Sequence, residues 1–188
     1  PLLTGLGVAN YVEQSTGKSC LVKWPNDVIV EGGKVSGILC ESKGSVVFIG
    51  IGINCESLPP GPPQRRRAPD SPGAPQPHSP GAAQPPALLP KVSLAGLGAP
   101  KTAPLAILEE VLLSLRAAFL SRDPLEKIGE KLYLKGRQVA VLPGTGGGET
   151  IHGILEGLGA GGQLLVRETD SRRLREIYSG ELTVPGVR

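Results

Sequence analysis

A proline-rich stretch divides this chain of 188 residues into two parts that can fold. Residues 59–104 hold 14 of the 19 prolines, in runs such as Pro59-Pro60-Gly61-Pro62-Pro63. Each proline fixes its own φ angle and lacks an amide donor, so such a stretch forms neither a helix nor a strand ladder. We therefore predict a low-complexity insert at 59–103, with ordered segments at 1–58 and 104–188.

The composition argues against several functional classes. The net charge of +3 comes without a basic stripe of interleaved aromatics, which argues against nucleic acid. No apolar run is long enough to span a membrane. Cys20, Cys40 and Cys55 share no metal-ligand spacing and are interpreted as reduced core residues, and no other pattern predicts a metal site. We expect a cytoplasmic protein, with an organelle stroma left open, because no signal peptide is visible at Pro1. The absence of Met predicts a fragment.

The first ordered segment predicts one helix followed by strands. Leu2, Leu6, Ala9 and Val12 have helical spacing, and Gly17 marks the end of the helix. The expected strands are Leu21–Lys23, Val28–Val30, Val35–Glu41 and Val46–Asn54. The pair Gly32-Gly33 predicts a hairpin turn between two of them.

The second ordered segment predicts two helices and then short strands. An apolar stripe spaced at 3, 4, 3 and 4 residues comprises Leu105, Leu108, Leu112, Leu115 and Phe119. Asp123-Pro124 marks the start of the next helix. The candidate strands are Gln138–Leu142, Ile151–Leu158, Gln163–Arg167, Leu174–Tyr178 and Glu181–Val184. Short strands at this spacing are typical of a small barrel or sandwich.

One five-residue run combines several functional groups. Lys23-Trp24-Pro25-Asn26-Asp27 holds a cation, an aromatic ring, an amide and a carboxylate. Because Pro25 interrupts a strand, Asn26 and Asp27 are expected at a bend where side chains reach a cleft. A structural bend with a solvated Asp27 explains the same residues.

The hairpin predicts a second charged residue on the same face. A turn at Gly32-Gly33 pairs Asp27 with Ile38 and places Lys34 on the face of Asp27, roughly 13 Å away. A cation and a carboxylate placed in this way can bracket an extended anionic ligand. A solvated lysine beside the turn is the alternative.

Glycines in the last strand of this segment predict a flat surface. Gly50, Gly52 and Asn54 share one face, opposite Ile49, Ile51 and Ile53. An adenine ring can lie on such a floor, because glycine in a strand often marks close approach of a ligand. Asn54 can then pair with the donor and acceptor edge of adenine. A tight crossing with another strand is the alternative.

Together these motifs resemble the biotin–protein ligase family. That family carries Lys-Trp-Pro-Asn-Asp, then Gly/Arg-Lys-x-x-Gly-Ile-Leu, then Gly-x-Gly-x-Asn, in this order and at short spacing. Here the three motifs read Lys23–Asp27, Gly33–Leu39 and Gly50–Asn54. The ending Gly180–Val184 is similar to the end of the family's small SH3-like domain.

The resemblance implies a mixed α/β (α+β) ligase core, truncated at its N-terminus, followed by a small SH3-like β-barrel. The implied divisions are a partial catalytic domain at 1–58, the insert at 59–103, a helical end of the catalytic domain at 104–135, and the SH3-like domain at 136–188. It implies that biotin and Mg²⁺-ATP form biotinyl-5′-AMP. A lysine of a biotin carboxyl-carrier domain of a carboxylase then takes the biotin.

The resemblance also implies a role for each matched residue. Lys34 would neutralise developing charge and Asp27 would orient and deprotonate the acceptor lysine, which makes these two the expected catalytic residues. The expected ligand-binding residues are Lys23, Trp24, Asn26, Gly37, Gly50, Gly52 and Asn54.

The sequence also departs from the family pattern. The Gly-Arg-Gly-Arg-x-Gly-Arg loop and the Thr and Gln positions that hold biotin have no match in it, and no helix-turn-helix segment is present. We therefore expect the fragment alone to be inactive. A lipoate–protein ligase and a non-catalytic paralogue that binds carrier domains remain as alternatives, and a homodimer is left open.

Overall fold

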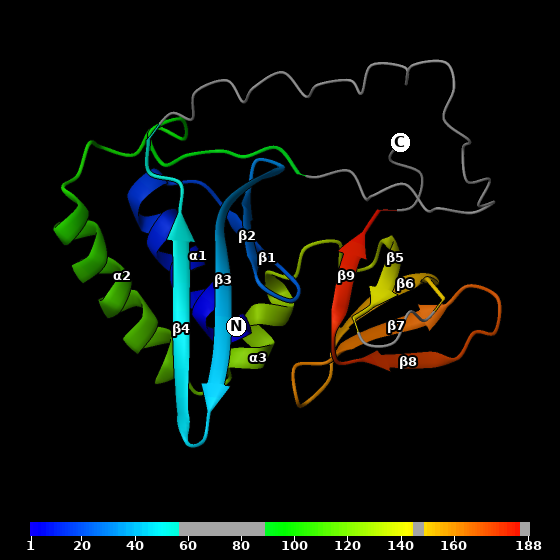
Figure 1. Cartoon of the computed structure of the whole chain (residues 1–188). Helices are drawn as coiled ribbons and strands as arrows, with labels where there is room; N and C mark the ends of the chain where they lie inside the picture. Colours follow the sequence, from blue (N-terminus) through cyan, green and yellow to red (C-terminus); the bar gives the residue numbers. More distant parts are fainter. Residues whose placement is uncertain (57–88, 145–148, 185–188) are drawn as a thin grey trace, which may run out of the picture.

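Two antiparallel sheets and three helices organise the chain in a computed structural model that describes residues 1–56, 89–144 and 149–184 (Figure 1). The first sheet has the order β1-β2-β3-β4, with β1 at Cys20–Lys23, β2 at Asp27–Val30, β3 at Gly33–Lys43 and β4 at Val46–Ile53. The second has the order β8-β7-β6-β5-β9, with β5 at Gln138–Pro143, β6 at Ile151–Leu158, β7 at Leu164–Glu168, β8 at Leu174–Ile177 and β9 at Gly180–Thr183. The expected mixed α/β fold is confirmed. Residues 57–88 of the predicted insert lie outside the described part of the chain.

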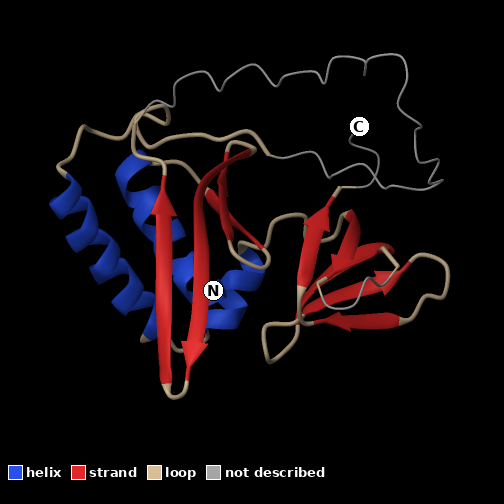
Figure 2. Cartoon of the chain, in the orientation of Figure 1, coloured by secondary structure: helices blue, strands red, loops and turns tan. Residues whose placement is uncertain are grey.

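The helices cover one side of the first sheet (Figure 2). They are α1 at Leu2–Thr16, α2 at Pro104–Phe119 and α3 at Pro124–Glu130. Helix α1 ends as predicted at Gly17, which has a φ of 68° and donates its N–H to the carbonyl of Glu13 at 2.8 Å. One core joins Leu6 and Val12 of α1 to Val22 and Val28 of the sheet. The side of the sheet away from the helices is therefore the side that stays open.

Helix α2 forms where its apolar repeat predicts, but a different face is buried. Val111, Ser114 and Ala118 are buried, and Ile107 and Leu115 pack against the core. Of the predicted stripe, only Leu115 packs inward, because Leu105, Leu108, Leu112 and Phe119 are each about half exposed or more. The helix is rich in apolar residues all round, so spacing alone did not identify the buried side.

The hairpin between β2 and β3 turns one residue earlier than predicted. Glu31 and Gly32 form the turn, with positive φ angles of 48° and 75°, and Val30 pairs with Gly33. A bulge then shifts the register, so that Ile29 pairs with Lys34 while Val28 pairs with Ser36. Asp27 consequently lies opposite Gly37 and not opposite Ile38.

Part of residues 89–103, the described end of the predicted insert, packs into the core. Leu94 and Leu97 are each 4% exposed and pack with the first sheet and its helices. Lys34 forms an isolated parallel bridge with Lys91. The prediction that the ordered part resumes only at residue 104 is therefore wrong, because Leu94 and Leu97 already pack in the core.

The second sheet has its own core and is tied to the first. Leu155, Leu164 and Leu182 are fully buried in it, together with Val139 and Val166. In the part of the chain that is described, its edge strands β8 and β9 do not pair, so the SH3-like barrel stays a prediction. The division into domains likewise stays a prediction.

None of the described helices is long and apolar enough to cross a membrane.

Candidate functional site

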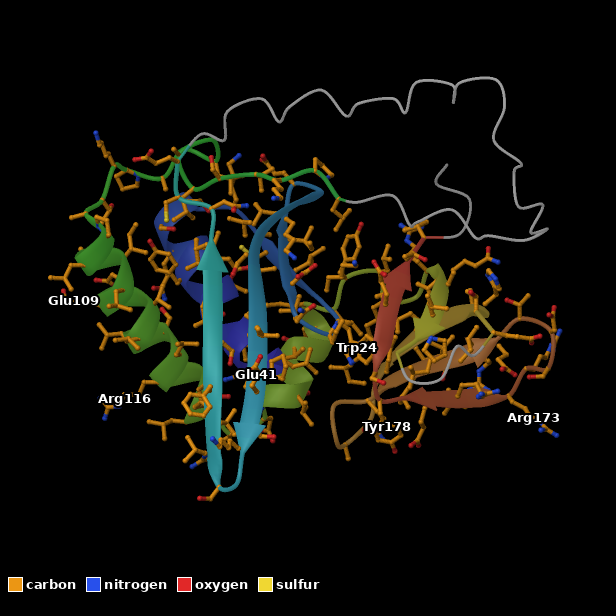
Figure 3. All side chains as sticks on the ribbon, viewed as in Figure 1. Trp24, Glu41, Glu109, Arg116, Arg173 and Tyr178 are labelled. Carbon is orange, nitrogen blue, oxygen red and sulfur yellow. The ribbon has the colours of Figure 1, made fainter. Side chains whose placement is uncertain are left out.

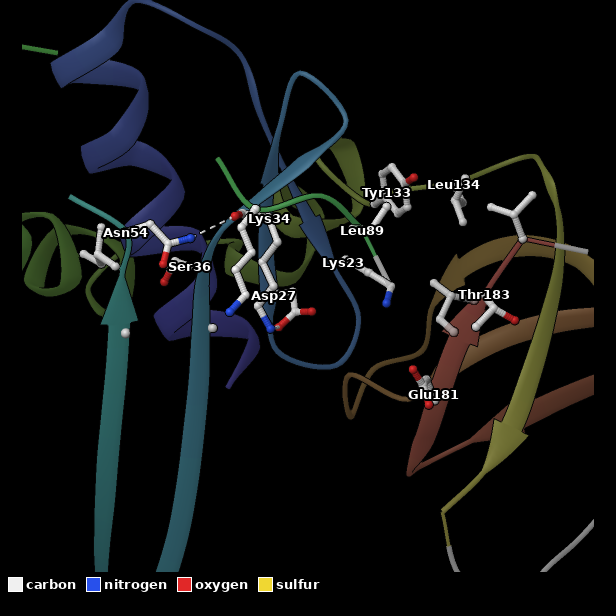
Figure 4. Close-up of a pocket in the computed structure, with 16 residues that line it drawn as sticks. Lys23, Asp27, Lys34, Ser36, Asn54, Leu89, Tyr133, Leu134, Glu181 and Thr183 are labelled. Carbon is white, nitrogen blue, oxygen red and sulfur yellow. Dashed lines mark hydrogen bonds and ion pairs between the residues drawn. The ribbon is translucent and has the colours of Figure 1, made fainter. Parts of the chain in front are cut away.

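A cleft of about 530 Å³ lies between the open side of the first sheet and strand β9. The sheet contributes Lys23, Asp27, Lys34, Gly37 and Gly52, among others. Figure 4 shows Asp27 and Lys34 close together, Glu181 and Thr183 across from them on β9, and Lys23 between the two sides. The volume is in the range that small-molecule sites of proteins occupy.

Lys34 and Asp27 form an ion pair at the floor of this cleft. Nζ of Lys34 lies 2.6 Å from Oδ1 of Asp27. The Asp27 side chain is 14% exposed and that of Lys34 37% exposed. The predicted offset of roughly 13 Å along the ribbon is wrong, because Lys34 pairs with Ile29, only two residues from Asp27. The bulge and the long lysine side chain bring them together.

Gly37 makes room for this ion pair. A Cβ atom added at Gly37 would lie 3.1 Å from both Cε and Nζ of Lys34 and 3.5 Å from Oδ1 of Asp27. Gly37 pairs with Gly52 on β4, and both residues line the cleft. The flat floor predicted from glycines therefore exists, but Gly52 forms it with Gly37. Gly50 pairs with Leu39 and does not line the cleft, so its place in the site stays a prediction.

Asn54 lines the cleft with its amide donors already used. Its Nδ2 donates to the carbonyl of Lys34 at 3.1 Å and to that of Val92 at 3.0 Å. Only its Oδ1 acceptor is available to a ligand. The expectation that Asn54 pairs with both the donor and the acceptor of adenine is therefore wrong for this conformation.

Trp24 and Asn26 make contacts within the protein. Trp24 is 2% exposed, packs in the core of the second sheet, and donates Nε1–H to the carbonyl of Gly162 at 3.2 Å. Figure 3 shows it where the two sheets meet. Asn26 closes the bend by donating from Nδ2 to the carbonyl of Ile38 at 3.0 Å. Neither residue lines the cleft, so a ligand contact of Trp24 or Asn26 stays a prediction.

Sequence reasoning missed several residues that line the cleft, among them Lys91, Tyr133, Glu181 and Thr183. Lys91 stands in the predicted insert, and Tyr133 follows a short pairing of Leu132 with Val22 on β1. Glu181 and Thr183 lie in the terminal motif that carries the family resemblance, which was the one signal that could have found them.

Among the described residues, no cluster of three or more His, Cys, Asp or Glu side chains could hold a metal ion. The cleft instead combines three lysines, namely Lys23, Lys34 and Lys91, with the carboxylates of Asp27 and Glu181. Such a cleft can bind an anionic ligand with a flat part, since cations and a side-chain-free floor meet there.

Comparisons with known proteins show similarity to biotin ligases. Residues 3–56 match the family described as the Biotin/lipoate A/B protein ligase family. The biotin–[acetyl-CoA-carboxylase] ligase of Paracoccus denitrificans is 54% identical over 43 residues, which cover 20% of this chain and 18% of that protein. The bifunctional ligase/repressor BirA of Bacillus subtilis is 38% identical over 63 residues, which cover 31% and 19%. These matches span less than a fifth of each relative.

A solved structure resembles nearly the whole chain. The apo structure of biotin protein ligase from Aquifex aeolicus has a TM-score of 0.72 and 26% identity, and the match covers 97% of this chain and 72% of that one. The same ligase in complex with biotin and ATP has a TM-score of 0.70 and 26% identity, over 97% and 69%. The similarity therefore includes both sheets, well beyond the residues matched by the family.

Proposed function

Because the chain belongs to the biotin–protein ligase family, we propose that it supplies the nucleotide side and the acceptor side of an ATP-dependent biotin ligation site. The observation that carries this proposal is the ion pair of Lys34 and Asp27 on the floor of a cleft that two sheets enclose.

The proposed reaction has two steps. A carboxylate oxygen of biotin attacks the α-phosphorus of ATP, the bond to the β-phosphate breaks, and biotinyl-5′-AMP and pyrophosphate form. The uncharged amine of an acceptor lysine then attacks the acyl carbon, the bond to the phosphate oxygen breaks, and AMP and a proton leave. Both steps gather negative charge on carboxyl and phosphoryl oxygens, which a fixed cation stabilises.

Lys34 is the residue proposed for this electrostatic role. Its ammonium is held at 2.6 Å from Asp27, so its position is set before a ligand arrives. A charge fixed in advance costs no reorganisation when the transition state forms. Asp27 is proposed to accept the proton of the acceptor lysine, because its carboxylate lines the cleft beside the ammonium of Lys34.

The nucleotide is proposed to lie on the floor of Gly37 and Gly52. The two glycines pair across β3 and β4 and present only backbone to the cleft. Asn54 would accept a hydrogen bond from the amino group of adenine through Oδ1, and Lys23 would face the phosphates. Mg²⁺ is proposed to arrive with ATP, since the described residues offer no set of three ligands for a resident ion.

The proposed acceptor is a biotin carboxyl-carrier domain of a biotin-dependent carboxylase. The name of the Paracoccus relative, a biotin–[acetyl-CoA-carboxylase] ligase, supports this choice. We also propose that these 188 residues do not complete the reaction alone. The Arg- and Gly-rich loop and the Thr and Gln positions that the resemblance assigns to biotin have no match in the sequence.

Transfer of labelled biotin to a carrier domain tests this function. The chain is assayed alone and with the part of Aquifex aeolicus biotin protein ligase that has no counterpart in it. We expect no transfer by either part alone, transfer by the mixture, and no transfer when Asp27→Asn replaces the natural chain. Binding of biotinyl-5′-AMP to the chain is measured alongside by calorimetry. Failure of the chain to bind this adenylate, or transfer of lipoate in place of biotin, would contradict the proposal.

A further inference from the structure

The segment that follows the undescribed part of the insert is fixed beside Lys34 by backbone hydrogen bonds. Lys34 donates its N–H to the carbonyl of Pro90 at 2.7 Å, and Val92 donates to the carbonyl of Lys34 at 3.0 Å. The amide of Asn54 donates to the carbonyl of Val92 at 3.0 Å. Lys91 is thereby held in place by bonds that do not involve its own side chain.

Gly33 allows the segment to approach β3 this closely. A Cβ atom added at Gly33 would lie 2.4 Å from Cγ1 of Val92 and 3.1 Å from the carbonyl oxygen of Pro90. The first of these distances is shorter than any ordinary contact, so a larger residue at 33 would move the segment. Gly33 of β3 thus helps to set the position of Lys91.

Lys91 faces the cleft beside Lys34. The two residues are partners in a parallel bridge, and paired residues of neighbouring strands place their side chains on the same side. Lys91 is exposed and lines the cleft. Within the described ranges Lys91 forms no ion pair, whereas the charge of Lys34 is compensated by Asp27.

Lys91 also decides the charge of the cleft. The three lysines Lys23, Lys34 and Lys91 against the two carboxylates Asp27 and Glu181 leave one net positive charge (3 − 2 = +1). Without Lys91 the same lining is neutral. A nucleoside triphosphate and pyrophosphate each carry several negative charges, which an uncompensated lysine attracts.

We propose that Lys91 binds the β- and γ-phosphates of the nucleotide and the pyrophosphate formed from them. This inference rests on the proposed function, which places the α-phosphate at Lys34. Neighbouring strands lie roughly 4.8 Å apart, so a lysine at the paired position can contact the next part of the same triphosphate. Lys91 would therefore discriminate a triphosphate from a monophosphate, a role separate from that of Lys34.

The test is equilibrium binding of ATP, AMP and inorganic pyrophosphate to the natural chain and to three variants. NMR chemical-shift titration is suitable because it measures millimolar dissociation constants. The variants are Lys91→Gln, Lys91→Arg, and Lys101→Gln as the matched control. Lys101 is an exposed lysine of the same segment that does not line the cleft. The backbone bonds of Pro90 and Val92 on either side of Lys91 predict that its variants keep their fold, and the titration spectra check this directly.

Lys91→Gln is expected to weaken binding of ATP and of pyrophosphate by roughly tenfold, because a charge-assisted hydrogen bond is lost. Binding of AMP should change by less than about twofold, since AMP lacks the distal phosphates. Lys91→Arg should keep most of the affinity for ATP, and Lys101→Gln should match the natural chain. An equal loss for ATP and AMP, or no loss at all, would overturn the role of Lys91. A natural chain that binds neither ATP nor biotinyl-5′-AMP would overturn the proposed function itself.

Discussion

The ammonium of Lys34 reaches Asp27, two pairs along the hairpin, by passing over Gly37. Nζ lies 2.6 Å from Oδ1 of Asp27, and a Cβ at position 37 would lie 3.1 Å from that nitrogen. The ion pair and the glycine therefore form one arrangement. The contact between Lys34 and Asp27 depends on Gly37, which has no side chain in its way.

Gly37→Ala should weaken ligand binding without much loss of stability. The added methyl group displaces the flexible end of Lys34, which can move into solvent, so the change in the free energy of unfolding should stay within about 1 kcal/mol. The affinity for biotinyl-5′-AMP, measured by calorimetry, should fall by roughly tenfold. Gly50→Ala is the control, because an added Cβ there meets only ordinary contacts at 3.8 Å and Gly50 does not line the cleft. Equal affinities for the two variants would argue against this arrangement.

Lys34→Ala should leave a folded chain that has lost its fixed cation. In the mixture that transfers biotin, release of pyrophosphate should fall by roughly a hundredfold. Lys34→Arg should not restore the rate, because the wide planar guanidinium does not fit over Gly37. Circular dichroism of each variant checks the fold. Pyrophosphate release at the natural rate by a folded Lys34→Ala chain would remove Lys34 from the mechanism.

Leu94→Ala should destabilise the chain far more than Leu105→Ala. Leu94 is 4% exposed in the core, so its truncation leaves a cavity and should lower the free energy of unfolding by about 2–4 kcal/mol. Leu105 on α2 is 67% exposed and its truncation should cost less than about 0.5 kcal/mol. Urea denaturation of the two variants measures the difference. Similar costs would mean that residues 89–103 do not pack as described.

Trp24→Phe should loosen the connection between the two sheets. The ring remains apolar, but the hydrogen bond to the carbonyl of Gly162 is lost, which should cost about 1 kcal/mol. Because the second sheet supplies Glu181 and Thr183 to the cleft, binding of biotinyl-5′-AMP should weaken although Trp24 does not line it. Urea denaturation measures the stability of the variant. A loss of stability with an unchanged affinity for biotinyl-5′-AMP would show that the cleft does not depend on this contact.

Cys20 should make stability fall at alkaline pH. Burial, and secondarily the nearby carboxylate of Glu13, raise the pKa of the Cys20 thiol to about 12, from 9.0. The folded chain then keeps a proton that the unfolded chain releases, so this contribution is complete below pH 9.0 and is lost as the pH rises to about 12. Urea denaturation across this range should show a weaker dependence on pH in Cys20→Val. Rapid alkylation of Cys20 in the folded chain at pH 8 would contradict the buried, protonated thiol.

The sequence located most helices and strands because their apolar residues follow the period of each element. Helix α1 and strand β6 appear at the residues predicted, and the other strands of the second sheet differ from prediction by one residue at one or both ends. Periodicity did not identify the buried face of α2, where Leu108 faces solvent and Val111 faces the core. Both are apolar, and only the packing of α1 against α2 distinguishes them.

The motifs predicted which residues of the first sheet meet, but their register could not be predicted. Gly32 and Gly33 both suit a turn, and the choice depends on Glu31, which adopts a positive φ and pairs with Lys18. The bulge after Val28 has no signal of its own in the sequence. Lys91 and Glu181 were missed because contacts between residues far apart in the chain bring them to the cleft.

Strand β9 gives the cleft a wall that belongs to a different sheet from its floor. A ligand that touches both Asp27 and Glu181 would act as a crosslink between two hydrophobic cores. The ligand would bind only while both cores are folded. Its binding free energy would therefore be lost when either core unfolds. Two cores that unfold separately in the free chain would unfold together in the complex, as a single cooperative transition.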